Sequence, residues 1–294
     1  MSYGKRITWL KRQEAKKYNV RDLASFENIV LFDMDGTLTP PRKPFDMSLM
    51  DSIRSLSKIA EIGIVSGSDI DYIREQLNHL ITKTEIRFKL HLLPCNGTKY
   101  YKPPAYSDDE HKLVHEVDMK TYLGEDDFYH LMRILNSLQA HISELAIPLS
   151  GNFIQYRGSM ANWCPIGRRA SSDERKQFID YDAKHNVRKD YLKRLVRKLS
   201  LYGMDKKITC SLGGETSFDI YPNGWDKTYA LKHFKNKKVW FVGDRCENGG
   251  NDQAIYNKLS SVSRSFKTKG TINTQLIIDE QLIPTINQTG KNND

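Results

Sequence analysis

The chain has 294 residues, of which 39% are hydrophobic and 28% charged, and its formal net charge is +9. A chain of this length can bury one large core or two modest ones. No window approaches the run of about eighteen apolar residues that a membrane span needs, and the basic start lacks the apolar stretch of a secretory signal. We therefore expect no membrane partner.

The four cysteines are scattered and form no C-x-x-C pair: Cys95, Cys164, Cys210 and Cys246. This spacing predicts free thiols rather than a disulfide framework or a zinc site, and so a cytoplasmic protein. The positive charge fits either a polyanion such as RNA or a small anionic substrate held by arginines. The positions of the arginines decide between these two partners.

Residues 1–27 are polar and basic, and we expect an N-terminal extension without identifiable chemistry. The apolar residues 29–32 that follow predict a buried strand of a parallel sheet, which is apolar on both faces. This strand runs directly into Asp33-Met34-Asp35-Gly36-Thr37. In open α/β sheets, ligands bind beyond the carboxyl ends of the strands, so this motif is expected to lie in a binding site.

The two carboxylates of this motif, Asp33 and Asp35, repel each other unless a cation or a shared proton joins them. Mg²⁺ supplies such a cation, since it binds through carboxylates and phosphate. Gly36 lets the backbone approach an anion, and the hydroxyls of Thr37 and Thr39 can donate to it. The pattern favours an aspartyl nucleophile beside an acid/base carboxyl over an ordinary acidic turn.

Strands and helices alternate in the next segment, which predicts a doubly wound parallel sheet. Apolar residues at helical spacing predict a helix over about 47–60 and another from about 70 to 80, with Ser68 or Asp69 as its cap. Residues 62–65 read as a strand between them, ending at Ser66, and 92–97 as a short strand and turn.

A different pattern begins near residue 106 and predicts an inserted α+β cap of helices and antiparallel strands. Its expected elements are a helix over 125–147, a half-exposed strand over 152–157, a basic helix over 188–201, and strands over 208–212 and 217–221. The predicted division is an extension over 1–27, a core over 28–111 and 223–285, a cap over 112–222, and a polar tail over 286–294.

The parallel core resumes with a helix that Lys227 opens and a strand over 238–243 that ends at Asp244. Asp244 repeats the placement of Asp33, so two neighbouring strand ends would bring both carboxylates to one metal. A lysine in the first turn of a helix opposes the helix dipole, which favours a functional reason for Lys227, such as neutralising a phosphoryl-aspartate.

The D-x-D-G-T motif resembles the first signature of the haloacid dehalogenase superfamily, whose members form a phospho-aspartate with Mg²⁺. The cap segments resemble eukaryotic-type phosphomannomutases in order and spacing over about residues 28–260. The matching segments are 151–157, Pro165–Arg168, Asp173–Arg175, Gly213–Asp219 and Gly224–Lys227.

The resemblance implies roles for eleven residues. Asp33 would be the nucleophile, Asp35 the acid/base, and Ser66 and Lys227 would contact the phosphoryl group. Mg²⁺ would be held by Asp33, the backbone carbonyl of Asp35, and Asp244. The implied substrate-binding residues are Arg42, Arg157, Arg168, Arg175, Ser217 and Asp219.

The implied reaction interconverts mannose 6-phosphate and mannose 1-phosphate, with a hexose 1,6-bisphosphate as intermediate and activator, and feeds GDP-mannose synthesis. The resemblance also implies a homodimer formed through the cap. Three cap arginines agree with this reaction on physical grounds, because a mutase must hold a second phosphate away from the reacting one.

The chain departs from the family pattern near the hinge and the metal. Cys95 and Gly158 replace a usual Glu and Asn, and no acid stands near Asn257 or Lys258, where relatives often have a second cation site. We expect that second site to be lost.

Three other functions are compatible with the sequence. A sugar-phosphate phosphatase or a phosphoglucomutase would use the same fold. A nucleic-acid-binding module would use the extension and the basic 184–198 segment, although such a charge run is usually a solvated face. We expect hexose phosphates, and no nucleic acid, as partners.

Overall fold

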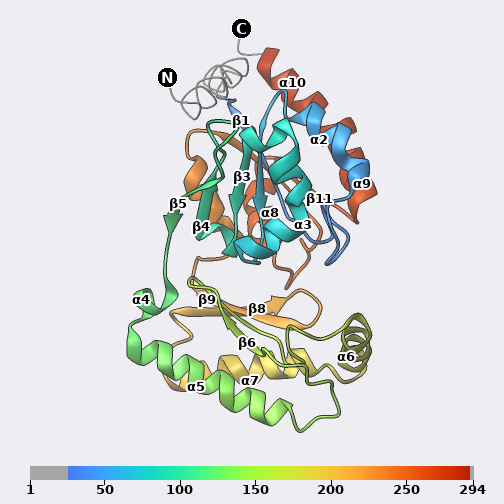
Figure 1. Ribbon diagram of the computed structural model, residues 1–294. Helices are drawn as coiled ribbons and strands as arrows, with labels where there is room; N and C mark the ends of the chain where they lie inside the picture. Colours follow the sequence, from blue (N-terminus) through green and yellow to red (C-terminus); the bar gives the residue numbers. More distant parts are fainter. Residues whose placement is uncertain (1–25, 292–294) are drawn as a thin grey trace, which may run out of the picture.

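The computed structural model describes residues 26–291 and consists of two domains joined by two short connections (Figure 1). The predicted N-terminal extension therefore lies, except for its last two residues, outside the described residues. One domain is built on a large, mostly parallel sheet and the other on a smaller antiparallel sheet, so the predicted fold class is confirmed.

The large sheet has seven strands in the order β11-β10-β1-β2-β3-β4-β5. Its first five strands run parallel, and β4 and β5 are antiparallel additions at one edge. The strands are β1 (Asn28–Phe32), β2 (Glu61–Val65), β3 (Leu90–Leu93), β4 (Lys99–Lys102), β5 (Lys112–Glu116), β10 (Lys238–Gly243) and β11 (Ser265–Lys267).

Helices cover both faces of this sheet, and β1 shows why. Val30 and Phe32 pack into the cluster formed with α2, α3 and η6, whereas Ile29 and Leu31 pack into the cluster formed with η5 and α8. The predicted two-sided burial of this strand is therefore confirmed. The helices of this domain are η2 (Met47–Leu49), α2 (Met50–Leu56), α3 (Ile70–Lys83), η3 (Glu85–Lys89), η4 (Cys95–Gly97), η5 (Lys227–Phe234), α8 (Gln253–Ser260), α9 (Thr271–Leu276), η6 (Ile277–Leu282) and α10 (Ile283–Lys291).

Two expectations about the edges of the domains differ from the structure. The segment assigned to the start of the cap, Lys112–Glu116, pairs with β4 as the outer strand of the large sheet. The expected polar tail over 286–294 is described only as far as Lys291; to that residue the chain is helical, and Ile286 is buried in the core. Ile286, with Ile283 one turn earlier, packs the last helix against the core of the domain.

The cap consists of a four-stranded antiparallel sheet, ordered β6-β7-β9-β8, with α5 and α7 packed on one face. Trp163 and Phe218, from neighbouring strands, stack in that core with ring centroids 4.6 Å apart. The cap elements are α4 (Met119–Leu123), α5 (Glu125–Ile142), β6 (Ile154–Tyr156), β7 (Ala161–Trp163), α6 (Ser172–His185), α7 (Val187–Leu201), β8 (Ile208–Gly213) and β9 (Ser217–Pro222). No helix was predicted at α6.

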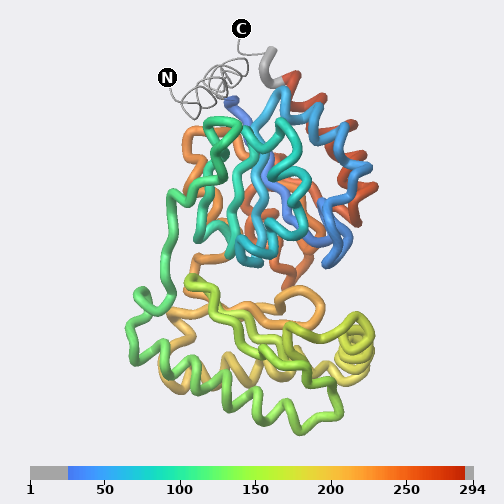
Figure 2. The backbone as a smooth tube through the Cα atoms, viewed as in Figure 1, coloured from blue at the N-terminus to red at the C-terminus, as the bar shows by residue number. Residues whose placement is uncertain are grey.

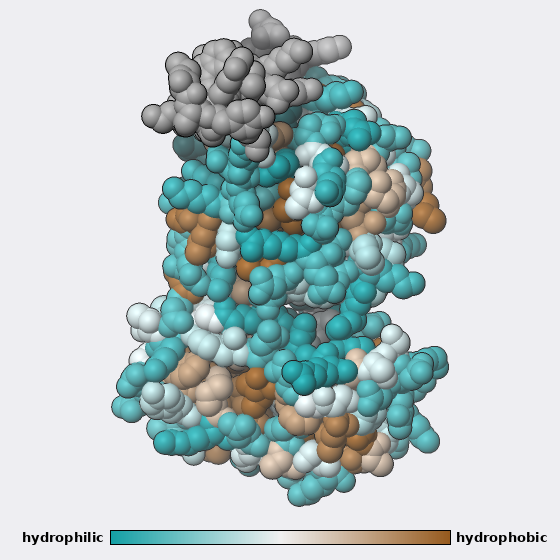
Figure 3. Space-filling model, in the orientation of Figure 1, coloured by the Kyte–Doolittle hydropathy of each residue, from teal (hydrophilic) through white to brown (hydrophobic). Residues whose placement is uncertain are grey.

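The chain leaves the large sheet after β5 and returns to it after β9 (Figure 2). The uncovered face of the cap sheet therefore points toward the carboxyl ends of β1, β2 and β10. Mostly hydrophilic side chains border the junction between the domains in the view of Figure 3. Within residues 26–291, no helix is long and apolar enough to cross a membrane.

Candidate active site

The site is built on the carboxyl ends of two adjacent strands. Strands β1 and β10 pair in parallel with Phe32 opposite Val242, and the amide of Asp33 donates to the Val242 carbonyl over 2.9 Å. Asp33 and Asp244 thus leave the sheet side by side. The sequence predicted this pairing from two apolar runs that each end in an aspartate.

Lys227 lies behind Asp33 and completes this arrangement. Asp226 caps the start of η5, and the Lys227 side chain, which is fully buried, forms ion pairs with Asp33 and Asp252. The Lys227 Nζ atom lies 2.5 Å from Asp252 Oδ1. A buried ammonium group needs such partners, because an unpaired charge in the interior is very costly. The neighbouring carboxylates raise the pKa of Lys227 although burial opposes this, so it carries a full positive charge.

Three carboxylates converge at this point, and one lysine does not balance their charge. Oxygen atoms of Asp33, Asp244 and Asp252 all lie within 4.8 Å of one another. Burial, with the negative charges of Asp252 and Asp244, raises the pKa of Asp33 well above its usual range against the pull of Lys227. Burial and Asp252 raise the pKa of Asp244 to about 6. A bound cation would relieve this repulsion.

Two details of the cluster fit a cation. Asp244 Oδ1 is buried and has no hydrogen-bond partner among the described residues. Gly36 has φ +82°, and a Cβ atom there would lie 2.4 Å from Asp244 Oδ2. Glycine therefore allows the loop after β1 to lie against Asp244, and it tolerates this backbone conformation without strain. Asp33, Asp244 and Asp252 are the residues able to hold a metal through their side chains.

The Asp35 side chain is not part of this cluster and is held by other groups. Asp35 Oδ1 accepts the amide of Arg42 at 3.0 Å and the hydroxyl of Tyr72 at 3.1 Å. Burial and the Asp35 charge raise the pKa of Tyr72, so its hydroxyl stays protonated and acts as a donor. Arg42 holds a left-handed conformation, φ 58°, which turns its amide toward Asp35.

The hydroxyl groups around the motif do not all behave as expected. Thr39 donates to the Met34 carbonyl over 3.2 Å, so its hydroxyl shapes the loop instead of facing a ligand. Thr37 Oγ1 is buried without a partner among the described residues. Ser66, at the end of β2, is buried and its Oγ accepts the amide of Ser68 at 3.1 Å, which leaves its proton free to donate.

A cavity of about 490 Å³ separates this cluster from the cap. Every residue to which the resemblance gave a role lines it, except Lys227, which lies behind Asp33. The core contributes the set Asp33, Asp35, Arg42, Ser66 and Asp244, and the cap contributes the set Arg157, Arg168, Arg175, Ser217 and Asp219. The residues predicted in the core and those predicted in the cap therefore line the same cavity.

The three cap arginines reach the cavity from three different segments, and they keep guanidinium N–H groups that can donate to a ligand. Arg157 follows β6 and donates to the Gly67 carbonyl of the core over 2.6 Å. Arg168 donates to Asn162 over 3.2 Å, and Arg175, near the start of α6, donates to Thr216 over 2.7 Å. The Nε atoms of Arg157 and Arg175 are buried without an acceptor in the described part of the chain.

These arginines also carry uncompensated charge. Burial and then Arg157 lower the pKa of Arg168, and burial and then Arg42 lower the pKa of Arg175. Both shifts mean that the charged guanidinium groups lack sufficient counter-charge. An anion such as phosphate would supply it and would accept their free N–H groups.

Strand β9 places its polar side chains in the cavity by simple alternation. Phe218 and Ile220 are buried in the cap core, while Ser217 and Asp219 face the opposite side of the sheet. Asp219 is only 7% exposed and accepts the side-chain amide of Asn162 at 2.7 Å. The cavity, rather than bulk solvent, is thus its environment.

The two departures from the family pattern lie together behind Arg157. The buried thiol of Cys95 is 4.0 Å from the Arg157 carbonyl oxygen. A Cβ atom at Gly158, where φ is +83°, would lie 3.4 Å from Lys99 Nζ. Both residues therefore adjoin the backbone that positions Arg157, and neither lines the cavity.

Several cavity residues were missed by the sequence analysis: Tyr72, Asn162, Arg188 and Arg245, together with Asp252 beside Lys227. Asp252 had a detectable signal, since it ends a glycine-rich loop shortly after Asp244. Arg188 was assigned to an exposed basic helix, and only its ion pair with Asp182 turns it inward.

The parallel core, the D-x-D motif, the buried lysine and the inserted cap together define a fold and a site of the haloacid dehalogenase type. Solved structures show the same fold: N-terminally truncated IMP-nucleotidase from Plasmodium falciparum aligns with a TM-score of 0.60 over 88% of this chain and 71% of its own, at 15% identity.

The sequence comparisons identify the family. The family model for eukaryotic phosphomannomutase matches residues 49–282. A phosphomannomutase of Drosophila melanogaster is 37% identical over 262 residues, which is 87% of this chain and 96% of that protein. One of Arabidopsis thaliana is 37% identical over 239 residues, 81% of this chain and 90% of its own. The chain belongs to the eukaryotic phosphomannomutase family of enzymes.

Proposed function

We propose that this protein interconverts mannose 6-phosphate and mannose 1-phosphate by transferring phosphate through Asp33. The observation that carries the proposal is the position of Arg157, Arg168 and Arg175, which face the Asp33 cluster across one cavity of about 490 Å³. A monoester phosphatase needs one phosphate site. Two opposed anion sites suit a sugar that carries a second phosphate during turnover.

In the proposed reaction an Asp33 oxygen attacks the phosphoryl group and forms an acyl phosphate. Asp35 protonates the leaving sugar oxygen and later takes the proton of the attacking hydroxyl. Lys227 and the Ser66 hydroxyl offset the negative charge that gathers on the phosphoryl oxygens, since this chemistry depends mainly on positioning and charge neutralisation.

Mg²⁺ is the proposed metal, and the acidic cluster supports it because three carboxylates share one lysine and Asp244 Oδ1 is unpartnered within the described residues. Asp33 and Asp244 would hold the ion together with the backbone carbonyl of Asp35, and Asp252 would face it from beside Lys227. When bound, it would neutralise phosphoryl oxygens and prevent repulsion between them and the carboxylates.

The cap arginines would hold the phosphate that is not reacting. A hexose 1,6-bisphosphate then serves as activator, because it loads Asp33 with phosphate, and as intermediate, because it must turn round between the two half-reactions. Closure of the cap would keep water, the competing acceptor, away from the acyl phosphate.

Three further features remain proposals. A cytoplasmic location is supported by four cysteines that are all free. A cap-to-cap homodimer and a supply of product for GDP-mannose synthesis rest on the family alone.

The direct test is an assay of the purified protein with mannose 1-phosphate, Mg²⁺ and a trace of hexose 1,6-bisphosphate, followed by ³¹P NMR. The proposal predicts mannose 6-phosphate as the main product. Free phosphate as the main product would replace the proposal with a phosphatase. Parallel runs with glucose 1-phosphate would show whether phosphoglucomutase activity is the faster one.

A further inference from the structure

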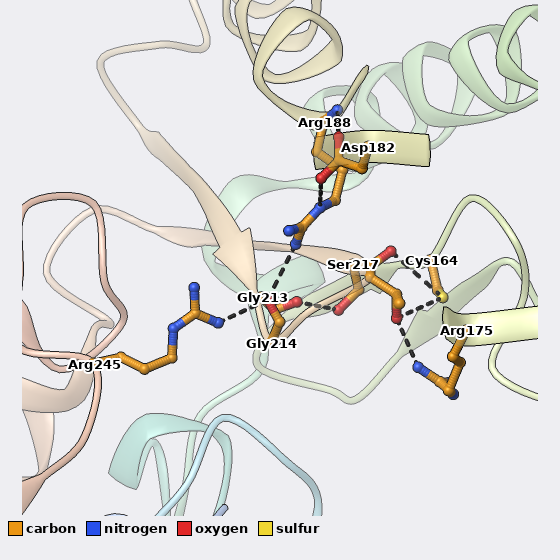
Figure 4. Close-up of polar contacts among 9 residues, drawn as sticks. Cys164, Arg175, Asp182, Arg188, Gly213, Gly214, Ser217 and Arg245 are labelled. Carbon is orange, nitrogen blue, oxygen red and sulfur yellow. Dashed lines mark hydrogen bonds and ion pairs between the residues drawn. The ribbon is translucent and has the colours of Figure 1, made fainter. Parts of the chain in front are cut away.

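The turn between β8 and β9 is bound by two arginines from different domains. The carbonyl oxygen of Gly214 accepts Arg188 Nη1 at 3.1 Å and Arg245 Nη1 at 2.7 Å. Arg188 reaches the turn from the cap, and Arg245 crosses from the core (Figure 4). One backbone carbonyl therefore joins the cap to the loop that carries the acidic cluster.

Arg188 is fixed in place by Asp182, near the end of α6. The Asp182 carboxylate accepts the backbone amide and the Nε atom of Arg188, each over 2.7 Å, and both side chains are 13% exposed. This pairing leaves the Arg188 Nη1 atom for Gly214. It is an internal support of the cap, because Asp182, Arg188 and Gly214 belong to the same domain.

Arg245 has the opposite character, because it belongs to the core, on the loop after β10 that carries Asp244 and Asp252. It directly follows Asp244, and its backbone amide donates to Asp252 Oδ2 over 3.1 Å. Its side chain takes part in no ion pair within residues 26–291, and it lines the cavity. The position of this arginine is thus tied to the acidic cluster at one end and to the cap at the other.

The Gly214 turn continues directly into the substrate side of the cap. Thr216, two residues on, accepts Arg175 Nη1 at 2.7 Å, and the Ser217 hydroxyl donates back to the Gly213 carbonyl over 2.7 Å (Figure 4). A displacement of this turn would therefore move Thr216, Ser217 and the support of Arg175 together.

From this geometry we propose that Arg245 is a positioning residue that fastens the cap over the acyl phosphate and so determines which acceptor receives the phosphate. This inference rests on the proposed function. In both outcomes the bond from phosphorus to the Asp33 oxygen breaks, with its electrons going to the carboxylate. A new bond forms to the acceptor oxygen, and the acceptor proton goes to Asp35. The acceptor is a sugar hydroxyl in the mutase and water in the phosphatase.

The strength of the contact suits a cap that must reopen. A single hydrogen bond from a half-buried guanidinium group contributes little on its own, and the like charge of Arg188 on the same carbonyl opposes it. The bisphosphate needs such reopening, because it must turn round within each catalytic cycle. An ion pair at this place would bind the cap more tightly and slow that step.

The test compares Arg245→Met and Arg245→Lys with the wild-type enzyme and with Lys58→Met, which removes an exposed positive charge far from the cavity. The measured quantity is the ratio of mannose 6-phosphate to free phosphate formed from mannose 1-phosphate with Mg²⁺ and hexose 1,6-bisphosphate. We expect the ratio to fall about tenfold in Arg245→Met, to recover in part in Arg245→Lys, and to stay unchanged in Lys58→Met.

An unchanged ratio in Arg245→Met would overturn the inference. If both products also fell equally, Arg245 would act on the chemistry itself. Hydrogen exchange over residues 211–217 gives a second readout that needs no turnover. We expect faster exchange in Arg245→Met, and unchanged exchange would also overturn the inference. A wild-type enzyme that forms no mannose 6-phosphate would instead refute the proposed function, and the exchange experiment would still decide the role of Arg245.

Discussion

Replacing Lys227 with Met tests the charge balance on which the site depends. The side chain of Lys227 is fully buried between Asp33 and Asp252, with Asp244 beside them. Methionine has a similar volume and removes the only ammonium group in contact with Asp33 among the described residues. The variant therefore leaves the buried Asp33 and Asp252, with the half-buried Asp244 beside them, without their ammonium partner.

The expected loss is large and depends on pH. Removing one partner of a buried ion pair costs about 3–5 kcal/mol. Two charges about 4.8 Å apart repel by roughly 3 kcal/mol at an effective dielectric constant near 20. The carboxyls respond by binding protons, so their pKa values in the folded variant exceed the unfolded value of about 4. A raised folded pKa contributes stability at low pH that is lost as pH rises through it.

The assay is urea unfolding of the variant, of wild type and of Lys232→Met at pH 5 and pH 8. Lys232 lies on the same helix, is exposed, and rests over the Tyr229 ring at 3.8 Å, so its loss costs less than about 1 kcal/mol. Because burial already raises the pKa of Asp244 to about 6, the deficit of Lys227→Met should grow between these two pH values. Mg²⁺ should reduce it at pH 8.

Three outcomes would support the reasoning together: a larger deficit at pH 8, partial rescue by Mg²⁺, and partial rescue by adding Asp252→Asn, which removes one negative charge. A Lys227→Met protein as stable as Lys232→Met at both pH values would refute it.

Three further variants test individual residues. Gly36→Ala places a Cβ atom 2.4 Å from Asp244 Oδ2 at φ +82°. We therefore expect the Mg²⁺ concentration that gives half-maximal activity to rise at least tenfold, with unchanged circular dichroism. An unchanged Mg²⁺ dependence would contradict the fit of this glycine to a metal site. Asp33→Asn should abolish turnover and the phosphoenzyme seen by mass spectrometry, because an amide cannot form an acyl phosphate; surviving turnover would exclude Asp33 as nucleophile. Arg175→Met should raise KM for mannose 1-phosphate about ten- to a hundredfold with a smaller change in kcat, since a charged hydrogen bond contributes about 1.5–3 kcal/mol; an unchanged KM would remove Arg175 from the binding site.

The parts of the fold that followed from the sequence are those with a strong local pattern. The apolar run before Asp33 and the run before Asp244 each predicted a buried strand and its end, and their parallel pairing brings the two aspartates together. The pattern over 217–221 likewise predicted a strand, and β9 forms there with every residue buried. In each case the period of the apolar residues matches the element that forms.

The parts that were missed depend on contacts between separate elements of the fold. Strands β4 and β5 are short and charged, and they exist because they pair with each other at a sheet edge. Asp252 lies in a polar loop, and only the fold brings it to Lys227. Arg188 has the sequence context of a solvated helix face, and its direction is set by Asp182 on the preceding helix. None of these contacts leaves a periodic signal.

The most direct test of the central claim follows one phosphate through a single turnover. The enzyme is first labelled with ³²P by a hexose 1,6-bisphosphate, freed of excess label, and then mixed with unlabelled mannose 1-phosphate and Mg²⁺. If phosphate passes through Asp33 to a sugar held by the cap arginines, the label appears in hexose phosphates. If the label appears in inorganic phosphate instead, water is the acceptor and the mutase account is wrong.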